Sequence, residues 1–140
     1  MEDSYRRIFD RWRRLQWLGW WGDYVDARFE LGRRASQLKR GTVLDLGCGN
    51  GVLLAEVPQS CRRVGVDWSV ERLATARTQA PGALLIRADM GCLPFRNGVF
   101  DTVLMAGVYE IFPDKRSFLT EVARTIDGDG QILATTPNGQ

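Results

Sequence analysis

The chain has 140 residues, of which 44% are hydrophobic and 26% are charged, so it is large and apolar enough to bury the core of one domain. Its formal net charge of +2 is too small to indicate nucleic-acid binding by itself. The three cysteines form no C-x-x-C pair and there is no histidine, which argues against a disulfide framework and against a zinc site.

The first 41 residues are basic and helical in pattern. They contain ten Lys and Arg against six Asp and Glu, whereas residues 42–140 are slightly acidic. Apolar residues at three- and four-residue steps predict an amphipathic helix over 4–21, which carries four of the five tryptophans, and a second helix over about 23–39. We expect an N-terminal helical arm, residues 1–41, that covers a pocket as a lid.

Two other roles for this Trp- and Arg-rich helix stay open. Such a helix can lie at a membrane surface, or its rings can stack on nucleic-acid bases. No apolar run approaches the roughly 20 residues that a membrane span needs, and the charged N-terminus has no signal-peptide pattern. The expected location is therefore cytoplasmic.

From residue 42 onward, short apolar strands alternate with helices. The predicted strands are 42–46, 63–67, 83–89, 100–107 and 131–136, the helices are 52–57, 69–79 and a segment after Asp114, and a turn is predicted at 127–130. This alternation indicates an α/β fold with a Rossmann-like, doubly wound parallel sheet over residues 42–140.

The residues best suited to bind a ligand stand at the predicted carboxyl ends of the strands, where ligands of such sheets bind. In chain order they are Asp45, Gly47, Gly49, Gly51, Asp67, Trp68 and Asp89. The Asp67 carboxylate suits two ribose hydroxyls, and Trp68 offers a flat face to a purine. Asp89 is placed to accept from the exocyclic amine of adenine, and Asp45 to hold a cationic amine.

The glycine-rich loop differs from the dinucleotide-binding fingerprint G-x-G-x-x-G. In "VLDLGCGNG", Val43–Gly51, the position of the third fingerprint glycine falls on Val52. The loop contains no basic residue and is preceded by an aspartate. These features favour an uncharged or cationic ligand over a pyrophosphate.

At this point the sequence resembles the class I S-adenosylmethionine-dependent methyltransferases, with a domain of the methyltransferase type 11 kind. The resemblance covers residues 42–138 and is carried by "VLDLGCGNG", "VGVDWSVERLATAR", "RADMGCLPFRNGVFDTVLMAGVYEIFPD" and "FLTEVARTIDGDGQILATTPN" in the family's order. It implies S-adenosyl-L-methionine as cofactor and transfer of its methyl group to an acceptor.

The resemblance also implies roles for individual residues. The three loop glycines let the backbone approach the methionine and ribose parts of the cofactor, with Cys48 beside them. Asp45 would face the methionine amino group, Asp67 the ribose hydroxyls and Asp89 the adenine amine. The remaining implied contacts are Trp68 and Met90 against adenine, and Ala106 beside the methyl sulfonium.

The catalytic residues cannot be carried over in the same way. Many relatives have a Glu-His pair after the fourth strand, but here the corresponding residues are Glu110 and Ile111. A histidine base is excluded, which leaves Glu110 and Tyr109 as candidates for assisting a proton transfer. There is no Asn/Asp-Pro-Pro-Tyr segment, which weakens the case for amino methylation of a base or of glutamine.

We therefore expect an enzyme that methylates a small-molecule, lipid or glycan-like acceptor. The alternatives are a non-catalytic cofactor-binding or partner-activating subunit and, third, a nucleic-acid methyltransferase. The family's usual sixth and seventh strands are missing, so the fifth strand is expected to be an open edge. That edge suits a homodimer or a partner chain, unless the chain is a fragment.

Overall fold

The computed structural model describes residues 21–136, and side chains from Ala27 onward. The predicted first helix therefore lies outside the described residues, apart from its last position. The elements are α2 (Trp21–Ser36), β1 (Thr42–Leu46), α3 (Val52–Glu56), β2 (Arg62–Asp67), α4 (Val70–Gln79), β3 (Leu84–Arg87), β4 (Phe100–Ala106), η1 (Tyr109–Ile111), α5 (Lys115–Thr125) and β5 (Ile126–Thr135).

The five strands form one parallel sheet in the order β3-β2-β1-β4-β5. This confirms the predicted Rossmann-like α/β fold. The strand order reverses between β1 and β4, so the carboxyl ends of these two strands flank the crevice where ligands of open α/β sheets bind. Among the described helices, none is long and apolar enough to cross a membrane.

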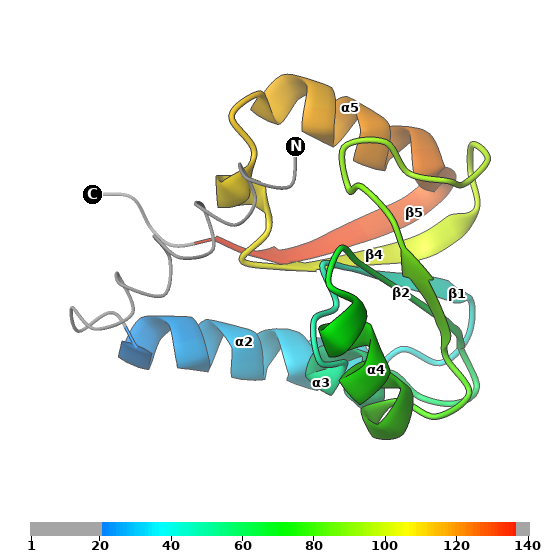
Figure 1. Ribbon diagram of the computed structural model, residues 1–140. Helices are drawn as coiled ribbons and strands as arrows, with labels where there is room; N and C mark the ends of the chain where they lie inside the picture. Colours follow the sequence, from blue (N-terminus) through cyan, green and yellow to red (C-terminus); the bar gives the residue numbers. More distant parts are fainter. Residues whose placement is uncertain (1–20, 137–140) are drawn as a thin grey trace.

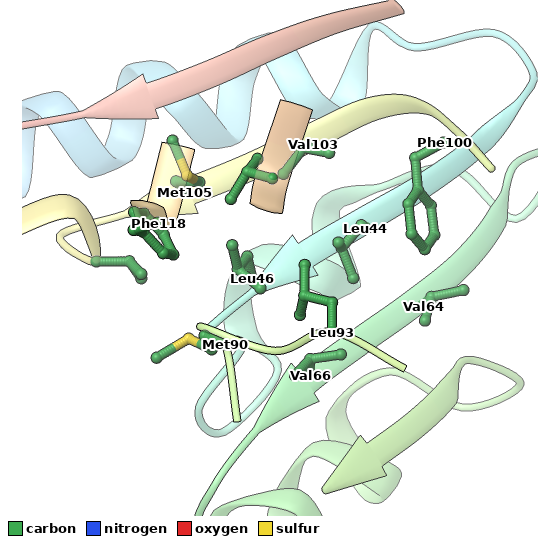
Figure 2. Packing of buried hydrophobic residues seen from close by; sticks show 12 residues of the cluster. Leu44, Leu46, Val64, Val66, Met90, Leu93, Phe100, Val103, Met105 and Phe118 are labelled. Carbon is green, nitrogen blue, oxygen red and sulfur yellow. The ribbon is translucent and has the colours of Figure 1, made fainter. Parts of the chain in front are cut away.

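Helices cover both faces of the sheet, with α5 on one side and α2, α3 and α4 on the other (Figure 1). The larger core lies under α5, where Phe118 packs with strand residues such as Leu44, Val66 and Met105 (Figure 2). These side chains alternate along each strand with residues of the opposite face, as expected for a sheet buried on both sides.

The second core joins α2 to the other face of the sheet. Leu31 and Ala35, four residues apart on α2, pack with Val43 and Leu104. Phe29, another apolar residue of this helix, does not join the core, because its side chain is 78% exposed. Since α2 contributes to the core of the sheet, the division of the chain at residue 41 stays a prediction.

The fifth strand begins earlier than predicted. Phe100 pairs with Ile126 and Thr102 with Gln131, so residues 127–130 bulge opposite the single residue Asp101. The predicted turn at 127–130 therefore lies inside β5, where it interrupts the pairing with β4. It does not connect α5 to the start of β5. The third strand is shorter than predicted and ends at Arg87.

Candidate functional site

The loop after β1 folds back against the end of β2. The backbone amides of Gly47 and Cys48 both donate to the carbonyl of Val66, at 2.8 and 2.9 Å. The amide of Gly51 donates to the carbonyl of Cys48, and α3 begins directly afterwards. The loop therefore presents its backbone at the carboxyl edge of the sheet, beside the point where the strand order reverses.

Gly47, Gly49 and Gly51 all have positive φ angles, of 73, 52 and 82°. A Cβ at Gly47 would lie 2.7 Å from the Val108 side chain, and one at Gly51 would lie 2.9 Å from the Ala76 Cα. The chain's own packing therefore accounts for these two glycines. At Gly49, which is buried, the nearest atom would be Arg72 Nη1 at an ordinary contact distance of 3.7 Å, so the positive φ angle and not a clash accounts for this glycine.

Gly51→Ala is expected to destabilise the protein by about 1–3 kcal/mol, because it adds both a left-handed strain and a clash with the α4 backbone. Gly128→Ala is the matched control: no atom would lie within 4 Å of its Cβ, and its φ is not positive. Urea unfolding should separate the two variants. Equal stabilities would contradict this account of the loop.

Asp67, at the end of β2, holds the loop in place. Its Oδ2 accepts from the amide of Gly49 and its Oδ1 from the amide of Ser69, both at 2.9 Å. Ser69 in turn caps α4 by accepting from the amide of Arg72. Each carboxylate oxygen of Asp67 has a second lone pair, so the group can still accept from two hydroxyls.

Trp68 and Asp89 both lie near the end of β3. The guanidinium of Arg87 lies 4.7 Å from the Trp68 ring centroid, and its Nε donates to the Trp68 carbonyl. The amide of Ala88 donates to the carbonyl of Asp67 at 3.3 Å, which brings the segment after β3 beside Asp67. Asp89 Oδ1 accepts from the amide of Gly91, so this carboxylate is also fixed in direction.

Asp45, the penultimate residue of β1, is 2% exposed and its Oδ2 has no hydrogen-bond partner. Burial raises the pKa of this carboxyl to about 7, and the nearby charge of Asp67 adds to the rise. The positive charge of Arg28 on α2 opposes it. A buried oxygen without a partner is unfavourable, so this position suits a ligand that brings a donor or a positive charge.

Three of the predicted cofactor contacts remain, namely Met90, Cys48 and Ala106. Met90 Sδ would lie 3.2 Å from a Cβ at Gly47, so the Met90 side chain packs on the loop. Cys48 is buried, and burial raises the pKa of its thiol well above the usual range. Ala106 is half-buried and borders a pocket of about 430 Å³ between α2 and α3, which Arg28 also lines.

Of the two candidates for proton transfer, Glu110 is the more unusual. Both of its carboxylate oxygens are buried without a hydrogen-bond partner. Burial raises the pKa of this carboxyl, and Lys115 opposes the rise. Tyr109 instead packs against the core under α5, with the Lys115 Nζ 5.1 Å from its ring centroid.

All the unpartnered buried side-chain oxygens of the described residues gather at one edge of the sheet. They belong to Asp45, Glu110 and Thr135, at or just beyond the carboxyl ends of β1, β4 and β5. Sequence reasoning missed Thr135 and Arg28. Thr135 could have been found, because it stands at the carboxyl end of a strand, where ligands of such sheets bind. In the sequence, nothing distinguishes Arg28 from the other basic residues of its helix.

The polar side chains at this site suit a small organic cofactor better than a metal ion. Within residues 21–136, no group of three or more His, Cys, Asp or Glu side chains could hold a metal ion. The acceptor capacity of Asp67 and the unpartnered Asp45 oxygen fit a ribose and a cationic amine.

Comparison with known proteins identifies the family of this domain. Residues 44–134 match the family model of a methyltransferase domain. A probable S-adenosylmethionine-dependent methyltransferase of Mycobacterium tuberculosis is 30% identical over 107 residues, which are 76% of this chain and 39% of that protein. Trans-aconitate 2-methyltransferase of Azoarcus sp. is 31% identical over 129 residues, 90% of this chain and 51% of that protein.

Among solved structures, the YcgJ protein of Bacillus subtilis superimposes with a TM-score of 0.67 at 23% identity, over 78% of this chain and 49% of that one. The fold and the family match thus define a methyltransferase domain. The chain belongs to the class I S-adenosylmethionine-dependent methyltransferase family. It spans between about two fifths and one half of the length of the curated relatives described above.

Proposed function

We propose that this chain binds S-adenosyl-L-methionine at the carboxyl edge of β1, β2 and β4 and transfers its methyl group to a small-molecule acceptor. The observation that carries the proposal is the juxtaposition of the buried, unpartnered Asp45 oxygen with the Asp67 carboxylate, whose charge acts on Asp45 and which holds the glycine loop. Family membership supports the same reading.

In this proposal the chain's own residues bind and orient the cofactor. Asp67 accepts from both ribose hydroxyls while it keeps Gly49 in place. Asp45 receives the amino group of the methionine part, and Asp89 receives the adenine amine. Trp68 and Met90 pack against the adenine, and Ala106, at the end of β4, borders the reacting centre.

When bound, S-adenosyl-L-methionine supplies an electrophilic methyl group on a sulfonium. The protein's contribution to the rate is then chiefly positioning, because an acceptor held in line with that methyl gains a large effective concentration. In this proposal Glu110, in η1 after β4, takes or holds the acceptor's proton. Tyr109 is the second candidate for this role.

The proposed acceptor is a small molecule because the relative that covers 90% of this chain is named for one, trans-aconitate. The test is methyl transfer from isotope-labelled S-adenosyl-L-methionine to fractionated cell extract. We expect label in the small-molecule fraction and none in nucleic acid. Cofactor binding without transfer to any fraction would favour a non-catalytic or partner-activating subunit, and label in RNA or DNA would contradict the proposal.

Cofactor binding at pH 6 is expected to release about one proton. With a pKa of about 7, Asp45 is mostly protonated at this pH in the free protein. A cationic amine beside it favours the ionised form, so the proton leaves on binding. Calorimetry in two buffers of different ionisation enthalpy measures the release. Asp45→Asn should abolish it, and a release unchanged by this substitution would assign the proton to another group.

The open side of β5 is the proposed contact for a second copy or a partner chain. In the described sheet β5 has a strand neighbour on one side, β4, and Ile132 on it is 40% exposed. Sedimentation of the wild-type protein, beside a variant with Ile132→Lys, tests this contact. A dimer that survives the substitution would place the interface elsewhere.

A further inference from the structure

Arg28, on α2, lies near the end of β1 at which Asp45 stands. Val43 and Asp45 point to the same face of the sheet, because they are two residues apart on one strand. Val43 packs with Leu31 of α2, so the side chain of Asp45 also lies on the face that this helix covers. Arg28 comes three residues before Leu31 and therefore lies one helical turn away on the same side of α2.

The direction of α2 brings Arg28 toward the carboxyl edge of the sheet. In Figure 1 the first residues of α2, in dark blue, lie on the same side of the molecule as η1, which follows the carboxyl end of β4. The helix therefore runs opposite to β1, and one turn before Leu31 is one turn nearer to the carboxyl edge. The electrostatics agree: burial raises the pKa of Asp45, and the positive charge of Arg28 opposes that rise. The two side chains thus approach one site, one from the helix and one from the strand.

Arg28 also lines the pocket of about 430 Å³ between α2 and α3. Ala106, the last residue of β4, lines the same pocket. Ala106 lies two residues beyond Leu104, which is the register partner of Asp45, and so it shares the face of the sheet with both. The pocket therefore reaches the carboxyl edge beside Asp45, and a ligand bound there has access to the Arg28 side chain.

The other arginine of this pocket, Arg33, is bound to a carboxylate of its own helix. Its Nε and Nη2 donate to the two carboxylate oxygens of Glu30, at 2.7 and 2.8 Å. Arg34 also donates to Glu30, at 3.0 Å, and does not line the pocket. Arg28 is therefore the arginine of this pocket whose charge acts on the carboxyl edge.

A carboxylate and a guanidinium that face one site suit an α-amino acid end, which carries an ammonium and a carboxylate on the same carbon. Asp45 Oδ2 accepts no hydrogen bond within the protein, from Arg28 or from any other donor. A zwitterion at this place would give Oδ2 an ammonium donor and would bring its own carboxylate to Arg28. The guanidinium offers a planar fork of N–H donors that matches a carboxylate.

We propose that Arg28 binds the carboxylate of the methionine part of S-adenosyl-L-methionine, while Asp45 binds its amino group. This inference rests on the function proposed above and adds to it a binding residue from α2, the helix that precedes the first strand. It also gives the site a selectivity. Adenosyl compounds that lack the carboxylate would leave Arg28 without this ligand and would bring a second positive charge to it, so they should bind more weakly.

The test is calorimetry with S-adenosyl-L-methionine, its decarboxylated form, and methylthioadenosine, which lacks the whole amino acid end. The wild type should bind the decarboxylated form roughly tenfold or more weakly than S-adenosyl-L-methionine, because a charge-assisted hydrogen bond is lost. Arg28→Met should weaken S-adenosyl-L-methionine by a similar factor and bind the decarboxylated form at least as well as the wild type does. Methylthioadenosine should bind both proteins equally, which also shows that the variant is folded. Arg34→Met, an exposed arginine of the same helix outside the pocket, is the matched control.

The contrary outcomes separate this inference from the proposed function. If the wild type binds none of the compounds at millimolar concentration, the proposed function fails and the role of Arg28 with it. If the wild type binds S-adenosyl-L-methionine and its decarboxylated form equally, or if its preference survives Arg28→Met, the role of Arg28 alone is wrong. Equal weakening of both compounds by Arg28→Met would also overturn it, since both carry the amino group and Arg28 would then act through Asp45. If Arg28→Met does not fold, Arg28→Gln and the wild-type preference decide the question.

Discussion

Replacing Asp67 with alanine is expected to weaken S-adenosyl-L-methionine binding by about 100-fold or more. The carboxylate would lose two hydrogen bonds to ribose hydroxyls, and hydrogen bonds to charged groups contribute about 1.5–3 kcal/mol each. The substitution would also remove the hydrogen bond that the Asp67 carboxylate accepts from the amide of Gly49 at 2.9 Å. Isothermal titration calorimetry measures the affinity directly.

Two further variants separate these causes. Asp67→Asn keeps the shape and one carbonyl oxygen, so its loss should be smaller than that of Asp67→Ala. Asp127→Ala removes an exposed carboxylate at the amino end of β5, which accepts from the amide of its neighbour Gly128, and should leave affinity unchanged. If Asp67→Ala binds the cofactor within threefold of the wild type, the ribose role assigned to Asp67 is wrong.

Glu110→Gln is expected to have opposite effects on stability and activity. At neutral pH the substitution removes a buried, unpartnered carboxylate and should stabilise the fold by about 1 kcal/mol. This value is at the low end of the cost of an unsatisfied buried group, because the residue as a whole is only half-buried. The same change removes the proposed proton acceptor, so methyl transfer should fall by about 100-fold. Thermal unfolding and labelled-methyl transfer measure the two effects.

The pH dependence of the stability gain identifies its cause. Burial raises the pKa of Glu110 in the folded protein, so the folded state binds more protons than the unfolded state just above the ordinary glutamate pKa, and this contribution to stability is lost as pH rises. The gain from Glu110→Gln should therefore be absent near pH 4 and grow toward pH 8. Glu56→Gln, an exposed glutamate on α3, should show no such trend. A gain equal at both pH values would indicate a packing effect.

The alternation of strands and helices was sufficient to predict the parallel sheet, and the edge at which the candidate site residues gather follows from it. Each strand run is short, apolar and bounded by turn residues, so local pattern and tertiary structure agree. The Asp-Gly-Asp-Gly run, residues 127–130, has a composition typical of a turn and led to a wrong start for β5. The pairing of Phe100 with Ile126 starts β5 before this run. Local composition does not reveal a strand partner 26 residues away in the chain.

Side-chain environments were less predictable than the fold. Phe29 fits the helical pattern but is exposed, because α2 meets the sheet through Leu31 and Ala35. The effect of Arg28 on Asp45 joins residues 17 positions apart on different elements. The unpartnered state of Glu110 likewise depends on what the fold places around it, which no local pattern records.

The central claim is that S-adenosyl-L-methionine binds at the carboxyl edge of the sheet, and amide NMR shifts on titration with this cofactor test it most directly. The account predicts saturable shifts at residues 47–51, 67–69 and 88–91, with the amino edge near Arg63 unaffected. The absence of shifts at millimolar cofactor, or shifts confined to the amino edge, would contradict it.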